Sequence, residues 1–194
     1  MSSTNRKQAA KAHDKYPTPV RLVRAAFDQL LVHRPRVAQA QSFLEPGAHA
    51  GAFCQVADLY CRGVKKPVGV DPYPPVIRHP YTLVQKDFLQ WKTRQTFDFI
   101  ATNPPFRLFE EFLLKSQSLL NLRGTMLYLM RLSVLGSKKR REFWPQVQLN
   151  EVWVVRPRPS FQKEGGSDSS EYAFFVFDRP SNGGPNPDMY WLDW

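Results

Sequence analysis

Apolar and polar positions follow one another along the chain in two different rhythms. Five short runs are almost wholly apolar and have the length of buried strands, and three longer segments carry apolar side chains at helical spacing. Nearly continuous apolar strands that alternate with helices are typical of a parallel sheet in an α/β protein, with helices on both faces. The expected strands are 41–45, 67–70, 81–85, 97–102 and 124–130, and the expected helices follow residue 19, span 51–61 and span 106–120.

The last third of the chain has a different pattern. Two β-like runs, Glu151–Val155 and Tyr172–Phe177, are separated by a loop rich in Gly and Ser, which is compatible with antiparallel pairing. The end of the chain is strongly aromatic from Met189 to Trp194, and we expect it to pack back on the domain. The expected organisation is a mobile basic start (1–15), one folded domain (16–180) and a tail (181–194).

The first helix is preceded by a segment rich in proline, Tyr16–Pro19. Thr18 is predicted to be the N-cap, because its hydroxyl can accept a hydrogen bond from a free backbone N–H. Pro19 is then the first helical residue, where a missing N–H costs nothing.

The main property that composition adds to this pattern is a high positive charge. With 194 residues, 42% hydrophobic and 13% aromatic, the chain has the make-up of one globular domain. Lys and Arg exceed Asp and Glu by 27 to 17, which gives a net charge of +10 and a pI near 9.8. A protein this basic attracts polyanions, so nucleic acid is favoured as a partner, and an acidic membrane surface is the alternative.

The location of the protein is indicated by what the sequence lacks. No apolar stretch reaches membrane-spanning length and the first residues contain no signal-peptide core, so we expect a soluble cytoplasmic protein. Cys54 and Cys61 lie seven residues apart on one face of a predicted helix. That spacing is not a zinc pattern and disfavours a disulfide, so both are expected to be reduced core thiols, and no metal site is expected.

Polar side chains follow four of the predicted strands: Glu45, Asp71, Asp87 and Asn103. In an open α/β sheet, ligands bind beyond the carboxyl ends of the strands. Each residue alone is more often a cap or a turn former, but four in succession favour a binding site. A Gly-rich turn, Gly47–Gly51, also allows close approach of a ligand to the backbone.

Asp71 follows the strand after this turn, 26 residues beyond Glu45. An acid at roughly that distance is the usual partner of a ribose diol in dinucleotide sites. The alternative, an Asp-Pro turn without a ligand, is equally compatible with the local sequence.

The sharpest motif is Asn103-Pro104-Pro105-Phe106. A strand end followed by a helix-starting proline explains Pro105 but not the whole tetrad. The Asn103 side chain and the Pro104 carbonyl offer two acceptors that can hold an amino group whose lone pair is delocalised into a ring. Phe106 can stack on that ring. The tetrad therefore predicts methyl transfer to an exocyclic amine, achieved by positioning and without a covalent intermediate.

These motifs, in this order, resemble the adenine-N6 DNA methyltransferases with a Rossmann-like class I fold, in particular small phage and prophage versions. The resemblance spans nearly the whole chain and implies a mostly parallel seven-stranded sheet with an antiparallel closing strand. It implies S-adenosylmethionine as the cofactor, adenine N6 in DNA as the acceptor, a short or loosely read site and a bacterial or phage-infected cell. The implied cofactor-binding residues are Tyr16, Thr18, Pro19, Glu45, Gly47, His49, Gly51, Asp71, Asp87, Phe88 and Asn103.

The resemblance also implies roles in substrate binding. The catalytic residues are Asn103, Pro104, Pro105 and Phe106, and the Arg158–Phe161 segment resembles a motif whose aromatic residue packs on the flipped base. Phe106 and Phe161 are accordingly expected to sandwich the target base. No separate target-recognition domain is expected, so phosphate contacts fall to the basic insertion that contains Lys138, Lys139, Arg140 and Arg141. The alternative for that insertion is a solvated basic helix.

One residue departs from the family pattern, because His49 stands where the loop usually has its middle glycine. If the position requires a positive φ, histidine costs about 1 kcal/mol there. Its bulk near the methionine end can weaken cofactor binding, and a merely tolerated substitution is the alternative to a cofactor contact.

Four alternatives stay open at this point. The same tetrad is compatible with adenine in RNA, with the N4 amine of cytosine and with a glutamine amide, although enzymes of the last kind usually carry Tyr in fourth place. A weakly active or inactive module that binds cofactor and nucleic acid is the fourth alternative. A monomer or weak dimer is expected.

Overall fold

The computed structural model describes residues 17–147, 149–159, 161, 170–179 and 187–194. Tyr16, the predicted mobile start and the Gly/Ser loop around 165–169 lie outside the described residues. The helices are α2 (Val20–His33), α3 (Ala52–Tyr60), α4 (Phe109–Leu119) and α5 (Trp144–Val147). The strands are β1 (Phe43–Pro46), β2 (Val68–Val70), β3 (Thr82–Val84), β4 (Phe97–Thr102), β5 (Leu120–Arg131), β6 (Leu149–Arg156), β7 (Tyr172–Asp178) and β8 (Asp188–Asp193).

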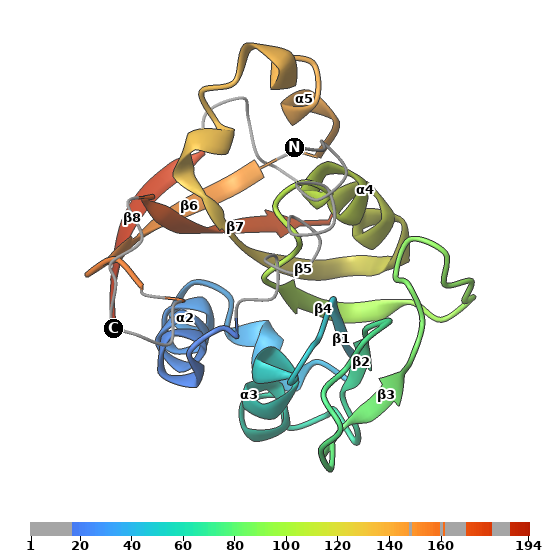
Figure 1. The fold of residues 1–194 in the computed structure, drawn as a ribbon. Helices are drawn as coiled ribbons and strands as arrows, with labels where there is room; N and C mark the ends of the chain where they lie inside the picture. The colour runs from blue at the N-terminus through green and yellow to red at the C-terminus, as the bar shows by residue number, and fades with distance from the viewer. Residues whose placement is uncertain (1–16, 148, 160, 162–169, 180–186) are drawn as a thin grey trace, which may run out of the picture.

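All described strands join in one sheet with the order β3-β2-β1-β4-β5-β7-β6-β8 (Figure 1). The strands from β3 to β5 are parallel, and β7 runs antiparallel to both of its neighbours, β5 and β6. The chain reverses its direction of travel across the sheet between β1 and β4, which is the place where open α/β sheets bind ligands. The predicted α/β class, the mostly parallel sheet and the antiparallel strand near the end are confirmed.

The sheet separates two apolar cores, because successive side chains of a strand point to opposite faces. Phe43 and Phe99 face α2 and α3, whereas their neighbours Leu44 and Ile100 face α4. All four are at most 1% exposed. The two helix layers lie on opposite sides of the sheet (Figure 1). Since both faces of the central strands are covered, their sequences are apolar throughout rather than alternating.

The number of strands differs from the expectation of seven, because the aromatic tail forms an eighth. Residues 188–193 pair in parallel with β6 and make β8 the edge of the sheet. The antiparallel strand β7 lies inside the sheet, between β5 and β6, and not at its end. The tail does pack back on the domain as expected, but it does so as part of the sheet, which extends past residue 180.

The start of α2 also differs from the prediction. The helix begins at Val20 and Pro19 takes the cap position, so the cap residue itself makes no side-chain hydrogen bond to the helix. The Thr18 hydroxyl is engaged elsewhere, because it accepts a hydrogen bond of 3.1 Å from the Asn103 amide. The local capping preference is thus outweighed by a contact with the end of β4.

A buried ionic network joins the end of α2 to the antiparallel part of the sheet. Glu151 is 5% exposed and accepts hydrogen bonds from His33, Arg34 and the Trp153 indole, at 2.7 to 2.8 Å. Arg34 also pairs with Asp178 at 2.7 Å. Because buried charges are costly unless they are paired, this network fixes α2 against β6 and β7.

Replacement of Gly51 by alanine is predicted to destabilise the protein. Gly51 has φ 74°, and a Cβ there would overlap the Tyr81 ring. Strain and overlap together should lower the free energy of unfolding by about 2–4 kcal/mol in denaturant titrations. Gly136→Ala is the matched control: its Cβ meets nothing within 4 Å, and we expect a change within about 0.5 kcal/mol. Equal stability of the two variants would contradict the packing of Tyr81 on the loop.

Candidate active site

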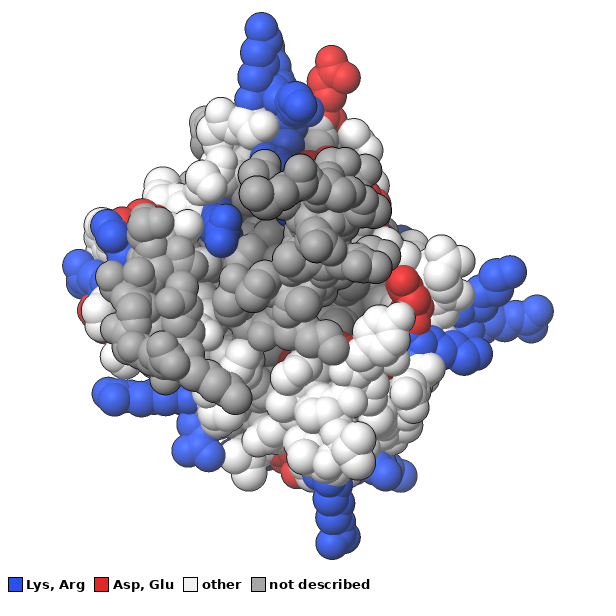
Figure 2. Space-filling view, in the orientation of Figure 1, with Lys and Arg blue, Asp and Glu red and all other residues white. Residues whose placement is uncertain are grey.

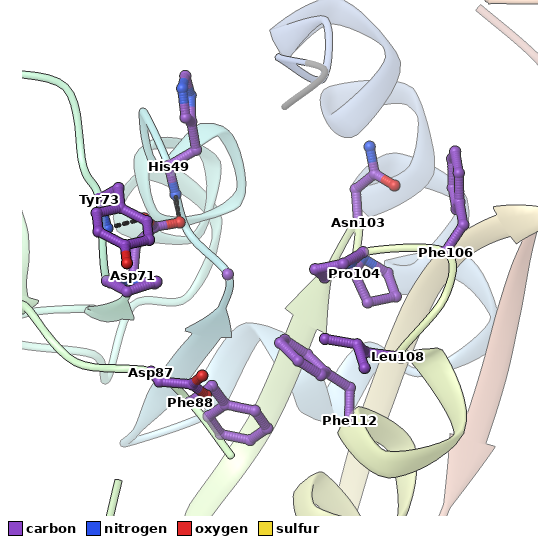
Figure 3. Close-up of a pocket in the computed structure, with 13 residues that line it drawn as sticks. His49, Asp71, Tyr73, Asp87, Phe88, Asn103, Pro104, Phe106, Leu108 and Phe112 are labelled. Atoms are coloured by element: carbon purple, nitrogen blue, oxygen red, sulfur yellow. Dashed lines mark hydrogen bonds between the residues drawn. The ribbon is translucent and has the colours of Figure 1, made fainter. Parts of the chain in front are cut away.

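The carboxyl ends of β1, β2 and β4 meet around one cavity of about 360 Å³ (Figure 3). Two walls face each other across it in Figure 3: Asp71 and Tyr73 on one side, and Asn103 and Pro104 on the other. Three apolar side chains form what we call the apolar slot: Phe88, Leu108 and Phe112. The remaining lining residues are Gly47, His49, Pro72, Asp87, Pro105 and Phe106.

The loop between β1 and α3 is held in an unusual conformation. Gly47, His49 and Gly51 have positive φ angles of 68°, 45° and 74°. His49 is therefore in the left-handed region that its place in the loop requires, at a cost of about 1 kcal/mol. The backbone N–H groups of Gly47 and Ala48 both donate to the Val70 carbonyl, which ties the loop to the neighbouring strand.

Asp71 is the polar centre of one wall and is 8% exposed. Its two carboxylate oxygens accept hydrogen bonds from the His49 N–H (2.9 Å) and the Tyr73 N–H (2.7 Å), as the dashed lines in Figure 3 show. Each oxygen can still accept a second hydrogen bond. Asp71 thus both orients the loop and presents acceptors to the cavity, so its turn-forming and ligand-binding roles are compatible.

A second cavity of about 200 Å³ lies behind the loop and shares Gly47, His49 and Asn103 with the first. It is also lined by Thr18 and Glu45 and by the start of α3. The His49 Nδ1 atom is buried and has no hydrogen-bond partner among the described residues. A ligand too long for either cavity would extend through both, and it would pass the three shared residues.

Glu45 acts on the start of α3. Its carboxylate accepts a hydrogen bond of 2.7 Å from the Cys54 N–H, one of the groups that a helix start leaves free. Burial raises the pKa of Glu45 to about 8, against the opposing effect of this hydrogen bond. The predicted ligand residue is thus also a helix cap.

Asn103 is held in a fixed orientation at the end of β4. Its Nδ2 group donates to the Thr18 hydroxyl at 3.1 Å. Its Oδ1 atom is buried and accepts no hydrogen bond from any residue that the structure describes. Buried acceptors in proteins are nearly always paired, and an exception calls for an explanation such as a catalytic role. The free acceptor belongs to the first residue of the tetrad and lies at the boundary of the two cavities.

Phe106 is partly buried, and its ring contacts two other side chains. The Arg131 guanidinium lies 4.6 Å from its centroid, and the Tyr172 ring lies 5.9 Å away. Phe161 contacts the same Tyr172 ring at 4.8 Å, is 6% exposed and lines neither cavity. The structure therefore does not bring Phe106 and Phe161 together as the two faces of a sandwich, because Phe161 is part of the core.

Sequence patterns did not point to four of the lining residues, namely Pro72, Tyr73, Leu108 and Phe112. Tyr73 follows the strand-end acid by two residues, which is a usable signal. Leu108 and Phe112 belong to a helical apolar pattern, which predicts a core position and nothing more. Asp87, by contrast, was predicted: it is exposed, lines the cavity and accepts a hydrogen bond from the Leu89 N–H at 2.7 Å.

The basic insertion after β5 divides its cations between two tasks. Arg140 pairs with Glu110 of α4 at 2.7 Å, and its guanidinium lies 4.9 Å from the Phe109 ring centroid. In this structure it anchors the insertion, and its predicted role in phosphate binding stays a prediction. Lys138, Lys139 and Arg141 are exposed. Figure 2 shows Lys and Arg side chains projecting at several places around this face, including the top, where Figure 1 places the insertion.

Two kinds of feature are absent from the described residues. They contain no group of His, Cys, Asp and Glu side chains arranged to hold a metal ion, and no helix long and apolar enough to cross a membrane. Cys54 and Cys61 are buried free thiols, as expected.

Comparisons with known proteins relate this fold to methyltransferases. No protein-family model and no curated protein matches the sequence. A Listeria monocytogenes protein assigned to the class I S-adenosylmethionine-dependent methyltransferases has a TM-score of 0.68 and 12% identity, with 87% of this chain and 64% of that one covered. The methyltransferase subunit of a type I restriction-modification system from Streptococcus thermophilus has a TM-score of 0.65 and 15% identity, over 92% of this chain and 47% of that one.

A third similar structure contains a ligand. The N-methyltransferase NodS from Bradyrhizobium japonicum, in complex with S-adenosyl-L-homocysteine, has a TM-score of 0.56 and 17% identity, over 81% of this chain and 87% of that one. This chain spans less than two thirds of the length of the Listeria and Streptococcus proteins. The fold is the Rossmann-like fold of class I methyltransferases.

The raised pKa of Glu45 predicts a pH-dependent stability. The group titrates near 4.5 ordinarily and at about 8 in the folded protein, so the folded state binds more protons between these values. The free energy of unfolding should therefore fall as the pH rises from about 5 to 8. Glu45→Gln keeps an acceptor but cannot titrate, so denaturant titrations at several pH values should show a smaller fall. Parallel curves for the two proteins would contradict the assignment.

Proposed function

We propose that the protein is an S-adenosylmethionine-dependent methyltransferase that methylates the N6 amino group of adenine in DNA. The observation that carries the proposal is the oriented and buried Oδ1 atom of Asn103, which no described residue pairs with and which lies at the start of the tetrad and at the boundary of two cavities. The fold it shares with class I methyltransferases and the net charge of +10 support the cofactor and the polyanionic substrate.

The residues present fit the proposed cofactor. The apolar slot suits a purine ring, and the free acceptor capacity of Asp71 suits a ribose diol. The second cavity, with Thr18, Glu45 and the start of α3, suits the amino-acid end. When bound, the cofactor supplies an electrophilic methyl group on a sulfonium ion. His49, which lines both cavities, would lie beside the junction of the two ends.

The chemistry of the acceptor amine is performed by position. In adenine the lone pair of N6 is delocalised into the ring, which makes the nitrogen a poor nucleophile. Acceptance of its two N–H groups by Asn103 Oδ1 and the Pro104 carbonyl favours a tetrahedral nitrogen whose lone pair points toward the methyl group. Thr18 keeps the Asn103 amide turned so that its oxygen, and not its nitrogen, faces the substrate.

The target base must leave the duplex to reach this site, or be single-stranded already. Unstacking costs a few kcal/mol. Stacking of the base on Phe106 can offset part of this free energy, since Arg131 supports one side of the Phe106 ring. Phe161 could take part only after leaving its place against Tyr172.

Transfer of a labelled methyl group to separate DNA, RNA and protein acceptors tests the proposal. We expect incorporation into DNA and N6-methyladenine in its nucleoside digest. Asn103→Ala should lose about 100-fold or more in kcat, a typical loss for one positioned polar group, and should lose far less in affinity for S-adenosylhomocysteine in calorimetry. Asn121→Ala is the matched control, because that amide bonds to Asp98 away from the cavities.

Each alternative gives a different result in the same assay. Label in RNA, in protein, or in N4-methylcytosine would replace the proposed acceptor. Cofactor binding without incorporation into any acceptor would favour an inactive binding module. Absence of cofactor binding would contradict the proposal as a whole.

The exposed cations of the insertion are predicted to bind DNA phosphates. Replacement of Lys138, Lys139 and Arg141 by Gln should reduce the slope of log affinity against log salt by about 0.9 for each phosphate that is no longer neutralised. The control replaces Arg62, Lys65 and Lys66, three exposed cations that precede β2, which neighbours the edge strand β3. Fluorescence anisotropy at several salt concentrations measures both slopes. Equal slopes would mean that the insertion does not bind the phosphates.

A further inference from the structure

A lysine outside both cavities fastens one wall of the apolar slot. Lys115 projects from α4, and its ammonium group donates to the carbonyls of Phe88 (2.5 Å), Leu89 (3.1 Å) and Trp91 (2.6 Å). The same ammonium lies 5.0 Å from the centroid of the Phe88 ring. One side chain thus satisfies three carbonyls of a single turn and contacts the ring that the turn carries.

The turn needs such a partner for a reason of local structure. After Asp87 the chain makes one helical turn, in which the N–H groups of Gln90 and Trp91 donate to the Asp87 carbonyl. Within the turn the Phe88 carbonyl accepts only a long hydrogen bond of 3.3 Å from the Trp91 N–H, and a turn this short leaves its last carbonyls without intrahelical partners. Together these carbonyls form a negative end that favours a cation. Burial lowers the pKa of Lys115, and the charge of nearby Asp87 opposes that effect.

Lys115 also belongs to the helix that forms the opposite wall of the slot. Leu108, Phe112 and Lys115 follow one another at spacings of four and three, so they share one face of α4 and its start. Leu108 and Phe112 line the cavity, and the Phe112 ring lies 4.9 Å from Phe88. The lysine therefore ties the turn that carries Phe88 to the helix that carries Phe112, and this sets the separation of the two rings.

We propose that Lys115 is a positioning residue for the nucleoside end of the cofactor, which holds Phe88 in the apolar slot through three backbone carbonyls. The inference rests on the proposed function and extends it to a residue that does not touch the ligand. This role differs from a general contribution to stability. Substitution of Lys115 should lower the affinity for ligands that carry the nucleoside and should leave the contribution of the amino-acid end to the affinity unchanged.

The test uses two ligands that share the nucleoside: S-adenosylhomocysteine and 5′-methylthioadenosine, which lacks the amino-acid end. Calorimetric titration of Lys115→Met should show both affinities reduced by about the same factor, roughly ten-fold, as for the loss of a charged hydrogen-bond donor. The cofactor KM should rise and kcat at saturating cofactor should stay within two-fold of wild type. Lys115→Arg, which keeps donors, should recover most of the affinity.

Lys92→Met is the matched control, since it removes an exposed lysine just after the same turn, and its affinities should equal those of wild type. Wild-type affinity of Lys115→Met for both ligands would overturn the inference, as would a loss confined to S-adenosylhomocysteine or a fall in kcat without a change in KM. If Lys115→Met does not fold, Lys115→Gln takes its place under the same criteria. Failure of the wild-type protein to bind either ligand would instead contradict the proposed function.

Discussion

The parallel pairing of β1 with β4 is the constraint on which the rest of the site depends. It places the end of β1 next to the end of β4, and the buried Thr102 hydroxyl locks the two together by donating to the Pro46 carbonyl at 2.5 Å. The Gly-rich loop and the tetrad begin directly after these two residues. A site built on two adjacent strand ends is fixed by the sheet and needs little further support from the loops.

The conformation of the Gly-rich loop has an energetic cost, and several hydrogen bonds offset it. Positive φ angles at Gly47, His49 and Gly51 are stabilised by the Val70 carbonyl and by the Asp71 carboxylate. In the proposed function Asp71 would couple the shape of the loop to ligand binding, because a ribose bound there would share its carboxylate with the His49 N–H. The histidine adds strain that glycine would avoid, and nothing in the described residues pairs with its Nδ1 atom to offset it.

The sequence sufficed to predict features that follow from short-range rules. Strand ends and the polar residues that follow them are dictated by apolar runs and their terminators, so Asp71 and Asn103 could be placed at one edge in advance. Strand lengths were less well predicted, because β5 (Leu120–Arg131) begins four residues before the expected start at 124. The roles of Phe161 and Arg140 could not, because both depend on partners distant in sequence, Tyr172 and Glu110. Thr18 shows the same limit. Threonine is a good N-cap residue, but the Thr18 hydroxyl instead accepts a hydrogen bond from Asn103, which lies 85 positions later.

The helix α4 connects the two halves of the proposed reaction. The tetrad leads directly into its start, and the Leu108 N–H donates to the Pro105 carbonyl at 2.9 Å. The next turns supply Phe112 and Lys115 to the apolar slot and to the turn opposite. A displacement of α4 along its axis would therefore move two things together: the oxygen atoms proposed to accept hydrogen bonds from the substrate amine, and the apolar slot proposed to hold the nucleoside. In the proposed reaction α4 would thus keep the distance between the methyl donor and the accepting amine constant. Methyl transfer by positioning depends most on this distance.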